Sequence, residues 1–152
     1  MIALRIPTIP IAQPRQRTTI RTTRDGKIFT GNYTPANHPV RQFKADVRAA
    51  VSRVLSAPLE GPVALRVVFV LPRPKRLIWK RREMPRVPHT SRPDLDNLVK
   101  STKDALNGLA WRDDSQVVEL SAGKCYASGN ELPGVEIAIE IAHDCTLLRG
   151  EE

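Results

Sequence analysis

The chain has 152 residues and a mass of 17.0 kDa, a size that fits one compact domain. Hydrophobic residues make up 41% and charged residues 26% of the sequence, which excludes wholesale disorder, and aromatic residues make up only 5%, so the core must consist mainly of Val, Ile, Leu and Ala. The formal net charge of +8 and the pI near 10.1 favour a polyanionic partner.

Membrane, secreted and zinc-dependent proteins do not fit the sequence. The longest apolar stretch, residues 63–71, contains Arg66 and is far shorter than the roughly 20 residues of a membrane span. The first ten residues lack the cationic and apolar regions of a signal peptide. Cys125 and Cys145 are too few for a disulfide framework, and the chain has only three His, so we expect a cytoplasmic protein with two free thiols and no zinc site.

The positive charge is unevenly distributed along the chain. Residues 1–93 contain 19 Lys and Arg against 4 Asp and Glu, whereas residues 94–152 contain 5 against 12. Two domains of opposite charge would each be too small for a comfortable core. We therefore expect a single domain over residues 1–152, with a basic surface around an acidic pocket. Two oppositely charged solvated faces without any chemistry are the alternative.

The periodicity of apolar residues predicts an α+β fold, a small mixed or antiparallel sheet packed against two helices. Asp25-Gly26 between two β-prone runs indicates a hairpin, and the strict alternation of residues 135–142 suggests antiparallel pairing with residues 116–126. The expected elements are a strand at 2–6, a hairpin at 18–23 and 27–30, a helix at 38–56, a strand at 63–71, a helix at 96–107, and strands at 116–126 and 135–142.

Residues 72–93 form a segment rich in proline and arginine, in which the proline density argues against regular structure. We expect a flexible loop or an extended basic arm that holds DNA phosphates, with the embedded Trp79 available for base stacking. A solvated connection without function is the alternative. The predicted phosphate-binding residues are Arg73, Lys75, Arg76, Lys80, Arg81, Arg82, Arg86 and Arg92. The last eight residues, 145–152, are an uninformative tail.

Carboxylates gather around the second predicted helix. Asp94 and Asp96 stand at its start, where two residues in extended geometry point the same way, and Asp96 or Asn97 could also cap the helix. Lys100 follows one turn later on the same face. If it is extended, the segment after the helix could bring Asp113 and Asp114 back to the helix N-terminus.

Such a cluster of carboxylates is unfavourable unless a cation neutralises it. Oxygen ligands suit Mg²⁺, with Mn²⁺ as a substitute, and a metal beside a basic surface suits hydrolysis of a phosphodiester. In that arrangement Lys100 would stabilise charge in the transition state or position a phosphate. Simple alternatives exist for each residue: Asp94 and Asp96 as helix caps, an Asp96–Lys100 ion pair, and Asp113 and Asp114 as turn residues.

The run RPDLDNLVKSTKDALNGLAWRDDSQVVEL, residues 92–120, resembles the signature of the RusA family of Holliday-junction resolvases. The family pattern is D-x-D-N-L-x-K, then D-A-L, then D-D-x-Q-V, and every element stands in this run. The order of the preceding elements is compatible with the family, although the insert at 72–93 is longer than its usual connection.

This resemblance implies a homodimeric, Mg²⁺-dependent endonuclease of mixed α/β fold, of a kind often encoded by prophages, without a small-molecule cofactor. It implies that Asp94, Asp96 and Asp114 bind the metal and are catalytic, with Asp113 assisting as a metal ligand, and that Lys100 is the active-site lysine. The expected function is resolution of four-way DNA junctions by paired symmetric nicks in recombination and repair. The alternatives are a non-catalytic protein of the same fold that binds branched DNA, and a basic RNA-binding or assembly protein.

Overall fold

The computed structural model describes residues 1–15 and 17–143, so the predictions for Cys145 and for the tail at 145–152 lie outside the described residues. The strands are β1 (Ile2–Ile6), β2 (Arg17–Thr22), β3 (Ile28–Tyr33), β4 (Val63–Leu71), β5 (Val87–Pro88), β6 (Val117–Tyr126) and β7 (Gly134–Ile141), the helices are α1 (Val40–Ser52) and α2 (Leu95–Leu106), and the short 3₁₀ turns are Lys75–Leu77 and Asp114–Gln116. Neither helix in the described ranges has the length or apolar character needed to cross a membrane.

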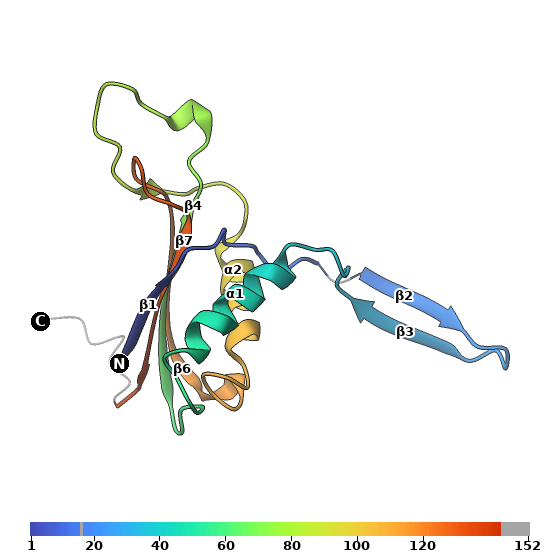
Figure 1. The fold of residues 1–152 in the computed structure, drawn as a ribbon. Coiled ribbons are helices and arrows are strands. Elements are labelled where there is room, and N and C mark those ends of the chain that lie inside the picture. The colour runs from blue at the N-terminus through green and yellow to red at the C-terminus, as the bar shows by residue number, and fades with distance from the viewer. Residues whose placement is uncertain (16, 144–152) are drawn as a thin grey trace, which may run out of the picture.

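Five strands form one mixed sheet in the order β1-β7-β4-β6-β5, and both helices pack on the same side of it (Figure 1). β4 and β6 run parallel, joined by the crossover that contains α2, whereas β7 runs antiparallel to β4 and to β1. This architecture confirms the predicted α+β fold. The opposite face of the sheet carries charged pairs such as Arg66 and Glu140, whose side chains approach to 2.9 Å.

The predicted pairing of residues 135–142 with residues 116–126 is wrong, because β4 lies between these two strands. β4 is buried on both faces along most of its length, which is the environment of a central strand. The seven-residue connection at 127–133 crosses the end of β4, where the Ala127 amide donates to the Leu71 carbonyl at 2.9 Å. β6 and β7 follow each other in sequence, but they are separated in the sheet by β4, which is more apolar and takes the central position.

The core lies between the sheet and the two helices. α1 buries Val40, Phe43, Val47 and Val51, whereas Val54 is 54% exposed because the helix ends at Ser52, earlier than predicted. The apolar face of α2 is buried as its spacing predicts. The core is completed by large residues that are fully buried, among them Phe69, Leu98, Leu106 and Trp111.

The predicted hairpin is present but contributes nothing to this core. β2 and β3 form a separate two-stranded sheet that projects from the body of the protein (Figure 1). Its turn contains Gly26 at φ +77°, a conformation that glycine adopts at little cost, as the Asp25-Gly26 signal predicts. The hairpin therefore depends on its own hydrogen bonds for its shape.

The loop at 72–93 is more ordered than its proline content predicts. It contains the 3₁₀ turn Lys75–Leu77 and the short strand β5, which pairs with the end of β6. Arg86 fixes the loop to the body of the protein, because its guanidinium bonds to Glu136 and, at 2.5 Å, to Glu131. Arg5 of β1 approaches Glu131 at 3.2 Å and Glu136 at 2.7 Å. A network of two arginines and two glutamates thus holds the base of the loop.

This network makes stability depend on pH in the acid range. The hydrogen bond from Arg86 is the main reason that the pKa of Glu131 falls from 4.5 to about 2, and it also lowers the pKa of Glu136. A carboxylate with a lowered pKa stabilises the fold fully above its unfolded pKa and loses that effect as the pH falls from about 4.5 to about 2. We expect the wild-type protein to lose about 2 kcal/mol of unfolding free energy across this range through Glu131, measured by urea denaturation.

Glu131→Gln should flatten the pH dependence over the same range. Glu60→Gln is a matched control, because the ion pair of Glu60 with Arg112 is 77% exposed on the glutamate side and should be worth little. Identical pH profiles for wild type and Glu131→Gln would contradict the assignment.

Candidate metal and DNA-binding site

Asp94 and Asp96 lie at the N-terminal end of α2. Asp94 is the N-cap residue, in extended conformation, which corrects the prediction of Asp96 or Asn97 as the cap. Its side chain makes no capping hydrogen bond, and neither carboxylate has a protein partner in the described part of the chain. Both residues are exposed. Two like charges therefore stand next to each other without a counterion from the chain itself, at the end of a helix whose dipole favours negative charge.

Lys100 is exposed one turn further along α2. The alternative of a simple Asp96–Lys100 ion pair is not observed, since no salt bridge joins them within the described ranges. The ammonium group is thus available to an external anion. Lys103, one turn later, instead approaches Asp114, and Asp104 pairs with Lys44 of α1 at 3.1 Å.

The segment that leads into Asp94 is held by β6. The Lys124 ammonium donates to the carbonyl oxygens of Ser91 and Pro93, both at 2.7 Å, and the hydroxyls of Tyr126 and Ser91 are 3.0 Å apart. The ring of His89 lies against Tyr126, with 4.3 Å between centroids. Burial and, next, the Lys124 charge lower the pKa of His89. Lys124 therefore fixes the backbone that presents the first carboxylate.

A hollow of about 630 Å³ opens beside Asp94. Its lining residues are Ala12, Arg15, Arg92, Pro93, Asp94 and Asn97. Residues 7–15, here called the N-terminal linker, follow β1 and are held at this place because the Gln13 amide donates to the Asn97 carbonyl at 2.9 Å. Arg92 was predicted as a phosphate-binding residue, whereas Arg15 was not, although the run IAQPRQR at residues 11–17 is basic. Two arginines next to a carboxylate suit a phosphodiester held beside a metal.

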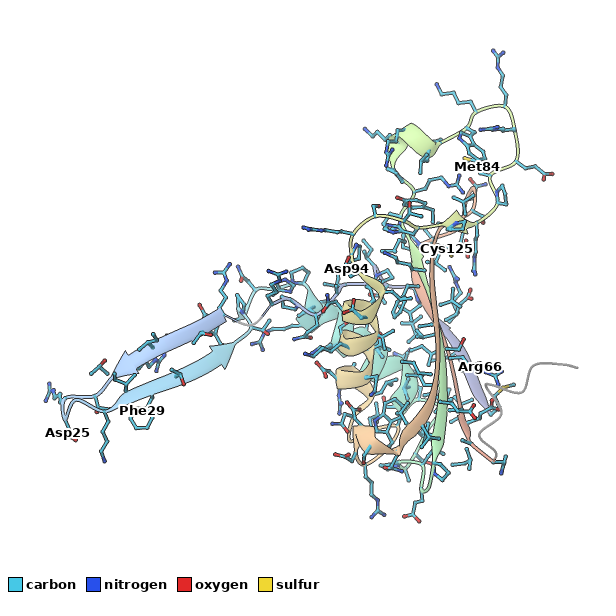
Figure 2. The ribbon with its side chains drawn as sticks, turned by 180° about the vertical axis from the view of Figure 1, so that it is seen from behind. Asp25, Phe29, Arg66, Met84, Asp94 and Cys125 are labelled. Carbon is cyan, nitrogen blue, oxygen red and sulfur yellow. The ribbon has the colours of Figure 1, made fainter. Side chains whose placement is uncertain are left out.

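Asp113 and Asp114 are not brought back to the start of α2, so the predicted convergence within one chain is wrong. The chain turns sharply after the helix, with Gly108 at φ +73°, and the fully buried Trp111 fixes the turn. The Trp111 indole donates to Asp114 at 2.8 Å, and Lys103 lies 4.0 Å from the same carboxylate. Figure 2 shows Asp94 at the opposite end of α2. Residues 1–15 and 17–143 contain no group of three or more acidic, histidine or cysteine side chains placed to hold a metal.

Asp113 has a local structural role. It begins the 3₁₀ turn Asp114–Gln116 with a reciprocal cap, in which its carboxylate accepts from the Ser115 amide at 2.9 Å. The hydrogen bonds from Ser115 lower the pKa of Asp113. Asp113 is therefore a turn residue in this structure, as the simpler alternative predicted. Its contacts do not support the predicted role of Asp113 as a metal ligand.

The predicted phosphate-binding residues of the loop fall into two groups. Arg73 and Arg86 are used internally: Arg73 donates to the Ala127 carbonyl at 2.9 Å and to the Leu77 and Pro85 carbonyls, and Arg86 binds two glutamates. The side chain of Trp79 lies beneath Arg82, whose guanidinium is 3.7 Å from the ring centroid. Arg86 is exposed although it is bonded, and the other exposed residues of the predicted set are Lys75, Arg76, Lys80, Arg81, Arg82 and Arg92.

Comparison with known proteins agrees with this arrangement. The family model described as "Endodeoxyribonuclease RusA" matches residues 7–140. The protein belongs to the RusA endodeoxyribonuclease family. A relative from Bacillus subtilis (strain 168), named "Uncharacterized protein YqaN", is 36% identical over 136 residues, which are 86% of this chain and 89% of that protein.

Membership of the RusA family confirms the predicted resemblance and supports nuclease activity on DNA. The matched residues include the N-terminal linker, both helices and the whole segment from Asp94 to Asp114.

We predict that Lys124 positions the start of α2 in this RusA-family protein. Lys124→Met would leave the Ser91 and Pro93 carbonyls without their donor, and we expect a loss of about 1–3 kcal/mol of unfolding free energy in urea denaturation. Amides of residues 98–101, the first in α2 with intrahelical acceptors, should exchange faster with deuterium. Lys124→Arg, which can still donate to both carbonyls, should restore most of the protection. Unchanged exchange in the Met variant would argue against this role.

Proposed function

We propose that this protein is a homodimeric, Mg²⁺-dependent endonuclease that resolves four-way DNA junctions by paired nicks. The observation that carries the proposal is the pair of unpartnered carboxylates, Asp94 and Asp96, between Lys100 and a hollow with two arginines. Family membership supports the nuclease activity. Arg15 and Arg92 beside Asp94, and Lys100 one turn along α2, would bind DNA phosphates without reading the sequence.

The donor set fits Mg²⁺. Asp94 and Asp96 offer exposed carboxylate oxygens, and Mg²⁺ commonly binds proteins through one or two carboxylates together with phosphate oxygens of the substrate. A bound Mg²⁺ or Mn²⁺ supplies an activated water and charge stabilisation for phosphodiester hydrolysis. Arg15 and Arg92 would hold the phosphodiester beside Asp94, and Lys100 would stabilise negative charge on it.

A third carboxylate would come from the second subunit. Asp114 lies past the far end of α2 in its own chain, and a helix of twelve residues is about 18 Å long. A two-fold dimer in which the two α2 helices run antiparallel would place Asp114 of the partner subunit near Asp94 and Asp96. Each of the two sites would then be complete only in the dimer.

The edge of β6 suits this dimer. β5 and the adjoining His89 amide cover β6 only at Lys124, Cys125 and Tyr126, and no other described strand pairs with its outer edge. Val118 and Leu120 are 57% and 44% exposed on this strand. A long uncovered edge with exposed apolar side chains is a template for pairing with a second chain.

Antiparallel pairing of two β6 strands about Leu120 would also align the catalytic residues. In that register Lys124 faces Gln116 of the partner subunit, two residues from the partner's Asp114. Lys124 is bonded to Pro93, which directly precedes Asp94. The same pairing that covers the free edge therefore supports a site made from both chains. Two matching sites related by a two-fold axis suit a four-way junction, in which two strands of like polarity are cut.

The first test of the proposed activity is Asp96→Asn. This variant keeps the size of the side chain but removes one negative charge, so it should cleave a synthetic four-way junction at least about 100-fold more slowly in Mg²⁺ and still bind it. Asp104→Asn is the matched control on the same helix, because Asp104 pairs with Lys44 at the other end. Equal cleavage by the Asp96→Asn variant and the wild type would exclude Asp96 from the site.

The second test separates a site within one chain from a site shared between chains. Asp96→Asn and Asp114→Asn should each abolish cleavage as homodimers. When the two variants are mixed and allowed to exchange subunits, half of the sites in each heterodimer combine the intact Asp96 with the intact Asp114 of the partner subunit. We expect single nicks in the junction to reappear, without paired resolution, in a gel assay. Sites built within one chain would leave every mixture inactive.

A further inference from the structure

We propose that the β2–β3 hairpin is a second DNA-binding element that stacks unpaired bases against Phe29 and Tyr33. The inference rests on the proposed action on branched DNA, which it deepens by naming how the protein would engage bases rather than phosphates. The hairpin lies outside the loop at 72–93, which is the segment predicted from the sequence to contact DNA.

Exposure of aromatic side chains is the first observation. Phe29 and Tyr33 are 57% and 49% exposed. The other Phe and Tyr residues are buried, at 1%, 0% and 7% exposure for Phe43, Phe69 and Tyr126. Trp111 is fully buried and Trp79 lies beneath Arg82. Among the described residues, a chain with few aromatics therefore places two largely open rings on one projecting hairpin.

The register of the hairpin puts both rings on one face. Phe29 is opposite Arg21, Tyr33 is opposite Arg17, and Gly31 between them is opposite Thr19. Strand residues two apart share a face, so the two aromatic positions are about 13 Å apart along β3. An open hollow of about 550 Å³ lies along this face, lined by Thr19, Arg21, Phe29, Thr30, Gly31 and Tyr33. A Cβ added at Gly31 would meet no protein atom within 4 Å, so packing does not require glycine there. The missing side chain leaves the hollow open.

Charge identifies the occupant as a polyanion. The hairpin carries Arg17, Arg21, Arg24 and Lys27 against a single acid, Asp25 at its tip (Figure 2). A second copy of this hairpin would be repelled by the same charges. Arginines directly across from aromatic rings match a nucleotide, since the guanidinium contacts the phosphate while the ring stacks on the base.

Unpaired bases fit this face better than duplex DNA. Aromatic rings gain nothing from the phosphates of a closed duplex, whereas each base stacked on a ring contributes strongly to single-strand binding. The hairpin also stands away from the sheet, with Phe29 projecting from its ribbon (Figure 2), so it can enter a branch point without moving the core. An isolated two-stranded ribbon is only marginally stable in water, and a bound strand would order it.

The test measures binding in EDTA, so that it does not depend on cleavage. Wild type and variants are titrated by fluorescence anisotropy with a single-stranded oligonucleotide and with a fully paired duplex of the same length. We expect Phe29→Ala and Tyr33→Ala each to weaken single-strand binding about 5- to 50-fold and duplex binding less than about 2-fold. Ile20→Ala is the matched control, because Ile20 is 68% exposed on the opposite face of the hairpin, and it should change neither affinity.

Gly31→Val provides a variant that fills the hollow without removing an aromatic ring. Valine favours strands, so the hairpin should remain folded while single-strand binding falls. The proposal would be overturned if Phe29→Ala, Tyr33→Ala and Gly31→Val weakened single-strand and duplex binding equally, or if none of them weakened binding. It would also be overturned if these variants changed the oligomeric state of the protein in sedimentation. A wild type that binds single strands through Phe29 but never nicks a junction in Mg²⁺ would refute the proposed nuclease function and leave this inference standing.

Discussion

The arrangement of the whole site depends on how the chain leaves α2. The fully buried Trp111 pins the turn that follows the helix, and its indole donates to Asp114. The acid at the end of the family signature is thereby held at one end of the helix, while Asp94 and Asp96 stand at the other. A rigid helix cannot bring its two ends together, so no local motion of side chains would unite these carboxylates. A second chain running in the opposite direction could do so, which is why the proposed site takes its third carboxylate from the partner subunit.

The structure brings parts of the basic residues 1–93 next to parts of the acidic residues 94–152. The acidic part includes the start of α2, and the basic part supplies three segments around it: the linker with Arg15, the hairpin, and the loop that ends in Arg92. Phosphates would be attracted by these segments and repelled by bare carboxylates unless a cation is present. Within the described ranges, Asp94 and Asp96 have no cationic partner of their own. In the proposed function, the basic segments would attract DNA and a divalent ion would neutralise Asp94 and Asp96.

Local patterns in the sequence predicted the elements well, because hairpin turns and apolar spacing act over a few residues. They predicted the Asp25-Gly26 turn and the buried face of α2. Pairing order failed for β7, since it depends on which strand is buried on both faces rather than on which strands are adjacent in sequence. The convergence of Asp114 with Asp94 failed because chain length sets only the largest distance that a segment can span. The buried Trp111 folds the segment after α2 into a tight turn, and the spacing of the carboxylates in the sequence does not indicate this turn.

The two basic arms differ in how they are attached, and this difference indicates different roles. The loop at 72–93 uses Arg73 and Arg86 to fasten itself to the body, leaving its other basic side chains exposed on an ordered frame. Such a frame suits contacts with phosphates, whose spacing along DNA is regular. Within the described ranges, the strands of the hairpin form a two-stranded sheet of their own, and this sheet carries the exposed rings. Bases at a branch point occupy variable positions, so a projecting arm can reach them where a fastened loop cannot. In this interpretation the loop at 72–93, which follows α1, holds phosphates in fixed positions, and the hairpin, which precedes α1, reaches the bases.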